Sequence, residues 1–194
     1  MSVFGLTGNP SSGKTTVLKL LKSKGAVIFD CDKKIHEYYR NKKSLVYKQI
    51  TASFPKVLKK GVIQRKLLGR EVFFDKRKLK ELEDIVHPVI KSDLLAWINK
   101  VRFKKGIFVA EVPLLFEKKL ESYFDSAILV LASVTSLLER LMEKYSISKE
   151  QALRRLSLYI PSSEKIEKAD FIINNNLGFL ELKKEVNLLW KKLK

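Results

Sequence analysis

Residues 5–16 read GLTGNPSSGKTT, and this stretch decides the fold because it contains a complete phosphate-binding motif. Residues 8–15 match the pattern G-x-x-x-x-G-K-[ST] in full. A short apolar run precedes the motif at residues 3–6, and residues 17–21 after it have the apolar spacing of a helix. Strand, loop and helix in this order are the context that such a motif requires. The sequence therefore predicts a loop that holds a phosphate.

The residue types in this loop indicate how the phosphate is held. Glycine lets the backbone approach an anion closely and turn its N–H groups inward, and the following helix offers its positive end. We expect Lys14 to reach the β and γ phosphates of a nucleotide and Thr15 to ligate Mg²⁺. Pro10 has no N–H group and cannot itself donate to the phosphate.

Four later apolar runs have the length and composition of strands. They are rich in branched or aromatic residues, do not alternate with polar residues, and occupy residues 26–29, 107–110, 127–131 and 171–173. Runs of this kind, separated by helical segments, are typical of a parallel sheet that is buried on both faces. Together with residues 3–6 they predict an α/β fold with five parallel strands flanked by helices.

The remaining segments read as helices. Residues 33–105 contain no comparable β run, so we expect a helical lobe there, inserted beside the sheet. After the fourth strand, Ser133 or Thr135 can cap one helix, and Ser148 with Gln151 has capping-box spacing for the next. Residues 179–192 form a last amphipathic helix. We expect a single domain, with a core at about 1–32 and 106–194, a substrate lobe at about 33–105 and a lid at about 144–162.

Length and charge narrow the classes of protein. The chain has 194 residues, 45% of them apolar, which suffices for one substantial core. A net charge of +18 would attract any polyanion, but the lysines are scattered along the chain, which favours a solvated basic surface over a dedicated nucleic-acid patch. No apolar run approaches the roughly 20 residues of a membrane span. With Cys31 as the only cysteine, we expect a cytosolic protein with no internal disulfide and no membrane partner.

Acidic residues follow two of the predicted strands. Asp30 and Asp32 stand at the end of the second strand, where an open parallel sheet binds ligands. They could therefore bind an acceptor hydroxyl or a metal. Alternatively, one of them only caps the next helix. Glu111 ends the third strand and belongs either to the shell around Mg²⁺ or to an ordinary strand end.

Histidine and arginine give weaker signals. His87 lies in the apolar segment IVHPVI, where a structural histidine is the commoner outcome, and with His36 and one cysteine besides, no zinc site can be assembled. Arg140, Arg154 and Arg155 lie in the late helical region. They either stabilise a transferring phosphoryl group or are solvated charges on helix faces.

Six segments, in their order and spacing, make essentially the whole chain resemble the dephospho-coenzyme A kinases. They are GLTGNPSSGKTT, FDCDKKIHE, RKLLGREVF, IVHPVI, EVPLLFE and KADFIINNN. The resemblance implies a reaction in which ATP phosphorylates the ribose 3′-hydroxyl of dephospho-coenzyme A, the last step of coenzyme A synthesis. It also implies a parallel core with a helical substrate lobe and a lid, and ATP and Mg²⁺ as cofactors.

The resemblance further implies roles for single residues. The residues expected to act on the reacting groups are Asp32, as base for the acceptor hydroxyl, with Lys14 and Arg140. Those expected to bind the nucleotide are Gly8, Ser11, Ser12, Gly13, Lys14, Thr15, Thr16, Arg154 and Asn175. Those expected to bind the acceptor are Asp30, Asp32, His87, Pro88, Leu114 and Leu115.

The chain also departs from the family pattern. Where the family usually has Gly-Gly-Ile-Gly-Ser-Gly-Lys-Ser-Thr, this chain has Asn9, Pro10 and Ser11 in the middle of the loop, so we expect a less flexible loop that still cradles the phosphate. The rival enzyme class is a nucleoside or nucleotide kinase of the same fold. The rival outside it is a nucleic-acid-binding ATPase, which would need a clustered basic footprint.

Overall fold

The computed structural model describes residues 2–73 and 75–194. The chain divides into two compact units, and it passes from one to the other after Asp30 and again before Trp97. The first unit consists of the residues up to Asp30 together with Trp97–Lys194, and the second is Cys31–Ala96.

The first unit is built on a parallel sheet of five strands in the order β2-β5-β1-β6-β7. The strands are β1 (Ser2–Thr7), β2 (Val27–Asp30), β5 (Ile107–Glu111), β6 (Ser126–Leu131) and β7 (Phe171–Asn174). The prediction of five parallel strands is thereby confirmed. Because helices cover both faces, the central strands are apolar without alternation.

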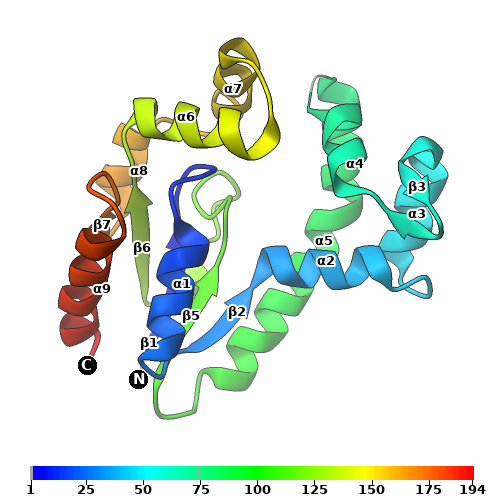
Figure 1. Ribbon diagram of the computed structural model, residues 1–194. Coiled ribbons are helices and arrows are strands. Elements are labelled where there is room, and N and C mark those ends of the chain that lie inside the picture. The colour runs from blue at the N-terminus through cyan, green and yellow to red at the C-terminus, as the bar shows by residue number, and fades with distance from the viewer. Residues whose placement is uncertain (1, 74) are drawn as a thin grey trace. The chain divides into compact units, whose positions relative to one another are not determined.

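Helices α1 (Lys14–Ser23) and α9 (Phe179–Leu193) lie side by side on one face of this sheet (Figure 1). Their apolar stripes and the strands form one buried cluster, which includes Leu6, Leu21 and Leu189. The C-terminal end of α5 (Lys76–Val101) covers the opposite face, where the Trp97 ring centroid lies 5.4 Å from that of Phe29.

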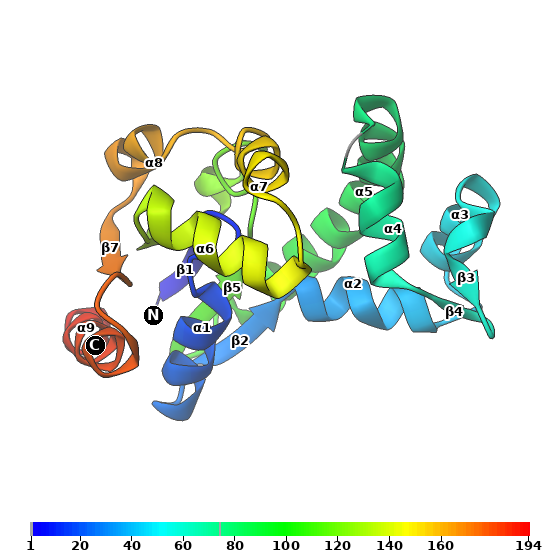
Figure 2. The same ribbon diagram turned by 45° about the horizontal axis from the view of Figure 1, so that its top comes forward.

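Three helices connect β6 to β7: α6 (Val134–Tyr145), α7 (Lys149–Leu156) and α8 (Ser162–Lys168). Both proposed caps are present, since Ser133 accepts a hydrogen bond from the backbone of Ser136 and Ser148 forms a complete capping box with Gln151. In Figures 1 and 2, α6 and α7 lie at the end of the sheet that carries the phosphate loop.

The second unit contains α2 (Cys31–Arg40), α3 (Leu45–Ser53), a short 3₁₀ turn (Pro55–Val57), α4 (Arg65–Val72) and the first part of α5. Its core is a separate apolar cluster that includes Ile50, Phe54 and Val72. The unit also holds a hairpin of β3 (Leu58–Lys59) and β4 (Val62–Ile63), which the sequence analysis did not predict. Strands of two residues are too short to leave a pattern. A second short turn, Glu121–Tyr123, belongs to the first unit.

No helix among residues 2–73 and 75–194 is long and apolar enough to cross a membrane.

The packing of α9 predicts a contrast between two neighbouring leucines. Leu189 is 5% exposed in the cluster with α1 and the sheet, whereas Leu188 is 57% exposed. Replacing a buried leucine by alanine leaves a cavity, so Leu189→Ala should lower the free energy of unfolding by about 2–5 kcal/mol. Leu188→Ala should change it by less than about 0.5 kcal/mol. Urea denaturation measures both, and equal losses would contradict the orientation of α9 described above.

Candidate active site

The phosphate loop joins β1 to α1, and two glycines make its path possible. Gly13 precedes α1 with φ of 102°, and a Cβ atom there would lie 2.2 Å from Nδ2 of Asn175. Gly8 has φ of 149°, and a Cβ atom there would lie 2.4 Å from the carbonyl oxygen of Val130. Both backbone conformations are rare for residues with a side chain. The two glycines of the motif are therefore required by the fold of the loop itself.

Hydrogen bonds hold the carbonyl groups of the loop. Nζ of Lys14 donates to the carbonyl oxygens of Gly8 and Asn9, at 2.9 and 3.1 Å. The guanidinium of Arg140 lies 3.4 Å from the carbonyl oxygen of Ser11, and Nδ2 of Asn175 donates to that of Ser12 at 2.7 Å. The first N–H groups of a helix have no carbonyl partner within it, and in α1 the carbonyl oxygen of Gly13, just before the helix, accepts from the N–H groups of Thr16 and Val17 at 3.0 and 3.1 Å. A loop whose carbonyl groups are bound in this way, ahead of a helix N-terminus, suits an anion.

The side chains of the loop also fit a phosphate group. Within the described part of the chain, Asn9 Oδ1, Ser11 Oγ and Ser12 Oγ are buried and have no hydrogen-bond partner. A polar atom buried without a partner is costly unless a ligand satisfies it. Thr15 is exposed in the first turn of α1 and Thr16 is half-buried beside it. The expected nucleotide-binding residues Gly8 and Ser11 to Thr16 thus lie in this loop and the first turn of α1.

Arg140 and Asn175 connect the late part of the chain to this loop. Besides its contact with Ser11, the Arg140 guanidinium donates to the carbonyl oxygen of Asn175 at 3.0 Å. Asn175 follows β7 and is buried. Arg154, by contrast, is exposed on α7, and its neighbour Arg155 packs with its guanidinium carbon 3.8 Å from the centre of the Tyr145 ring. Among the sequence-predicted arginines, Arg140 contacts the loop, at the carbonyl oxygen of Ser11.

Two carboxylates stand at the carboxyl edge of the sheet in the first unit. Asp30 and Glu111 end β2 and β5 and are direct partners in the strand register. Glu111 is buried and also pairs in register with Leu6, just before the loop. Among the described residues, no group of three histidine, cysteine, aspartate or glutamate side chains could hold a metal by itself. This donor set fits Mg²⁺, which is usually bound by one or two protein ligands with phosphate oxygens and water.

Asp32 belongs to the second unit, in the first turn of α2, and its side chain is exposed. His36 and Tyr39 follow it at positions that share one face of a helix. They help to line a pocket of about 420 Å³ whose other walls include Arg40 and Arg65. Tyr39 is largely buried, and this burial raises its pKa to about 12.

The other residues expected to bind the acceptor are dispersed. His87 and Pro88 lie inside α5, where Nδ1 of His87 is 3.7 Å from Oε2 of Glu83. Leu114 is half-buried in the turn after β5. Leu115 is fully buried, and it lies where a Cβ atom on Gly5 would be 3.1 Å from its side chain. We expected Leu115 to contact the substrate, but the structure places it in the core. Its side chain has no exposed surface with which to contact a ligand.

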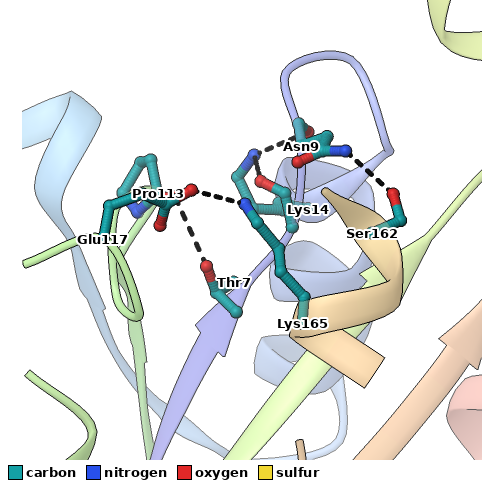
Figure 3. Close-up of polar contacts among 8 residues, drawn as sticks. Thr7, Asn9, Lys14, Pro113, Glu117, Ser162 and Lys165 are labelled. Atoms are coloured by element: carbon teal, nitrogen blue, oxygen red, sulfur yellow. Dashed lines mark hydrogen bonds and ion pairs between the residues drawn. The ribbon is translucent and has the colours of Figure 1, made fainter. Parts of the chain in front are cut away.

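Sequence reasoning missed one cluster next to the loop, which Figure 3 shows. Lys165 on α8 is fully buried, and its Nζ lies 2.7 Å from Oε1 of Glu117. One helical turn earlier, Ser162 Oγ accepts a hydrogen bond from Nδ2 of Asn9 at 3.0 Å. Lys165 lies in the polar segment SSEKIEK, so its sequence context resembles that of a solvated helix.

The comparisons with known proteins agree with this geometry. The model of the family described as dephospho-CoA kinase matches residues 2–181. A dephospho-CoA kinase from Aquifex aeolicus is 34% identical over 195 residues, which cover 100% of this chain and 98% of that protein. A dephospho-CoA kinase structure from Campylobacter jejuni has a TM-score of 0.67 and 27% identity, over 99% of this chain and 97% of the other. A crystal structure from Thermus thermophilus has a TM-score of 0.75 and 32% identity, over the same shares of the two chains.

The shikimate kinase of Bacteroides thetaiotaomicron, at 14% identity and a TM-score of 0.55, shares the fold alone. The match of the family model over nearly the whole chain, together with the complete phosphate loop, places this chain in the dephospho-CoA kinase family.

Proposed function

We propose that this protein transfers the γ-phosphate of ATP to the ribose 3′-hydroxyl of dephospho-coenzyme A. The observation that carries the proposal is the phosphate loop with its bound carbonyl groups, in a chain that belongs to the dephospho-CoA kinase family. The alternatives are a nucleoside or nucleotide kinase and a nucleic-acid-binding ATPase. We also propose a cytosolic location, with which the burial of Cys31, the one cysteine of the sequence, is compatible.

The first unit binds ATP in this proposal. The phosphates lie against the loop of Gly8 to Gly13 and the first turn of α1, where Lys14, Thr15 and Thr16 stand. Mg²⁺ would be held by the Thr15 hydroxyl, with the carboxylates of Asp30 and Glu111 in its surroundings, and it would supply positive charge to the phosphate oxygens. Asn175 orients the nucleotide from the other side of the loop. Residues 144–162, with Arg154, are assigned as the lid.

The second unit binds the acceptor in this proposal, as part of a substrate lobe at about 33–105. The pocket beside α2 suits a diphosphate, because its lining includes Arg40, Lys59, Arg65 and Lys66 and, among the described residues, no aspartate or glutamate. Asp32 stands on the same helix as the pocket residues His36 and Tyr39. That placement supports a role for the Asp32 carboxylate at the ribose end of the same ligand.

The proposed chemistry assigns one role to each of these residues. Phosphoryl transfer depends chiefly on alignment and on neutralising charge, so the loop and Lys14 orient the γ phosphate. Asp32 accepts a hydrogen bond from the 3′-hydroxyl and takes its proton as the oxygen attacks the γ phosphorus, while the bond from that phosphorus to the bridging oxygen breaks and ADP leaves. Arg140 provides positive charge beside the loop. His87, Pro88 and Leu114 keep the supporting acceptor roles proposed for them.

An acceptor comparison tests the function directly. With ATP and Mg²⁺, the protein should phosphorylate dephospho-coenzyme A and show little activity with AMP, adenosine or single-stranded DNA. Lys14→Ala should lower kcat by at least about 10²-fold, because it removes a charge from the transferring phosphate. A coupled assay measures turnover, and phosphorus NMR locates the new phosphate. Preference for AMP or adenosine, or stimulation of ATP hydrolysis by DNA, would favour one of the alternatives.

Asp32 and Asp30 form a matched pair for testing the base. Asp32→Asn keeps the size of the side chain but removes its basicity, so kcat should fall by about 10² to 10⁴-fold. Asp30→Asn should have a milder effect, because Asp30 is assigned to the surroundings of the metal. Steady-state kinetics should be combined with calorimetric ATP binding, which should change little in Asp32→Asn. Normal turnover of Asp32→Asn would remove the assigned base.

The two arginines can be separated in the same way. Arg140→Ala removes the contacts to Ser11 and Asn175 and should lower kcat/KM by at least about tenfold, or about 1.4 kcal/mol of transition-state stabilisation. Arg154→Ala should lower kcat/KM by a similar factor only if the lid brings this exposed residue to the nucleotide. If Arg154→Ala matches the wild type, Arg154 is a solvated charge and the lid assignment fails at that residue.

A further inference from the structure

Lys165 is a buried charge that the proposed chemistry does not use. Its side chain has no exposed surface, and its ammonium forms an ion pair with Glu117, which is 11% exposed. Burial lowers the pKa of Lys165, while the carboxylate of Glu117 acts in the opposite direction. Taking two charges out of water is favourable only when their mutual contact is close. The pair is therefore sensitive to the position of the two segments that carry it.

The Glu117 side of this pair is fixed to the core of the first unit. Glu117 lies in the turn after β5, in which Leu115 is fully buried near Gly5. In the same turn, the carbonyl oxygen of Pro113 lies 3.4 Å from Oγ1 of Thr7. Thr7 is the last residue of β1 and leads directly into the phosphate loop. The turn that carries Glu117, the partner of Lys165, is therefore connected to the residue that precedes the phosphate loop.

The Lys165 side of the pair reaches the loop by a second route. Ser162 lies three residues before Lys165 on α8, so both side chains lie near the same stripe of the helix. Ser162 Oγ binds Nδ2 of Asn9, and the carbonyl oxygen of Asn9 accepts from Nζ of Lys14. Figure 3 shows these contacts on either side of the loop. Asn9 is thereby held at its side chain by α8 and at its backbone by Lys14.

We propose that Lys165 and Glu117 are a positioning pair for the phosphate loop. The ion pair fixes α8, and α8 uses Ser162 to hold Asn9 in the conformation that receives the phosphates of ATP. The inference deepens the proposed function at its nucleotide site. It concerns a contact made by the side chain of Asn9, at a position where the motif G-x-x-x-x-G-K-[ST] leaves the residue open.

The pair predicts a selective loss of ATP binding. Lys165→Met keeps the length of the side chain but leaves the Glu117 carboxylate without its cation, so α8 should shift. The dissociation constant for ATP, measured by calorimetry without acceptor, should rise by at least about tenfold. The KM for dephospho-coenzyme A should stay within about twofold. Lys168→Met is the matched control, because Lys168 is an exposed lysine on the same helix and its loss should change neither constant.

A second pair of variants tests the contact with the loop and does not disturb the buried charges. Ser162→Ala removes the acceptor for Asn9 and should weaken ATP binding by about threefold to tenfold, the range for one hydrogen bond. Ser163→Ala is its control, since Ser163 is the exposed neighbouring serine. In the Ser162→Ala background, Lys165→Met should cost less ATP affinity than it costs in the wild type, because both changes act through one route.

Several outcomes would overturn the inference. They are unchanged ATP affinity in Ser162→Ala, equal weakening for ATP and dephospho-coenzyme A in Lys165→Met, and strictly additive losses in the double variant. If Lys165→Met does not fold, the comparison of Ser162→Ala with Ser163→Ala still decides. Because ATP binding is measured without acceptor, a wild-type protein that binds ATP but ignores dephospho-coenzyme A would refute the proposed function and leave this inference standing.

Discussion

The phosphate loop can turn its N–H groups toward an anion because its carbonyl oxygens are occupied on the other side. Lys14 binds the carbonyl groups of Gly8 and Asn9, Arg140 approaches that of Ser11, and Asn175 binds that of Ser12. The donors in these four contacts are side chains, and one backbone group of the loop, the N–H of Ser12, also donates to the carbonyl oxygen of Asn9, at 3.1 Å. This constraint links the loop to the rest of the first unit, because its donors come from α1, α6 and the end of β7.

The connection explains why the late part of the chain belongs to the site. Residues 133–175 run from the end of β6 through three helices and back into the sheet. Along this path the chain supplies Arg140 to the carbonyl of Ser11, Ser162 to the side chain of Asn9, and Asn175 to the carbonyl of Ser12. A movement of α6 or α8 is therefore transmitted to the loop through hydrogen bonds to its backbone and to Asn9.

The sequence revealed the elements whose signals are local. Five apolar runs, a complete phosphate motif and the capping box at Ser148 each depend on neighbouring residues, and all three are present as predicted. The ion pair of Lys165 with Glu117 joins residues far apart in the chain, and a lysine among polar residues gives no sign of burial. Leu115 shows the opposite problem. An apolar residue in the segment EVPLLFE can either contact a substrate or fill the core, and the sequence does not distinguish the two.

The middle of the loop shows how this chain holds its phosphate site with Asn9, Pro10 and Ser11 between the two glycines of the motif. Ser11 has φ of 62°, a left-handed conformation that costs a residue with a side chain about 1–2 kcal/mol. Pro10 and Asn9 offset this cost, because proline restricts the unfolded chain and the Asn9 side chain binds α8. Glycine at position 11 would relieve the strain, but it would also allow the loop many other conformations. Restricting the loop to one conformation on binding would then cost more conformational entropy. In this protein the side chain of Asn9 ties the loop to α8, a contact that a glycine at position 9 could not make.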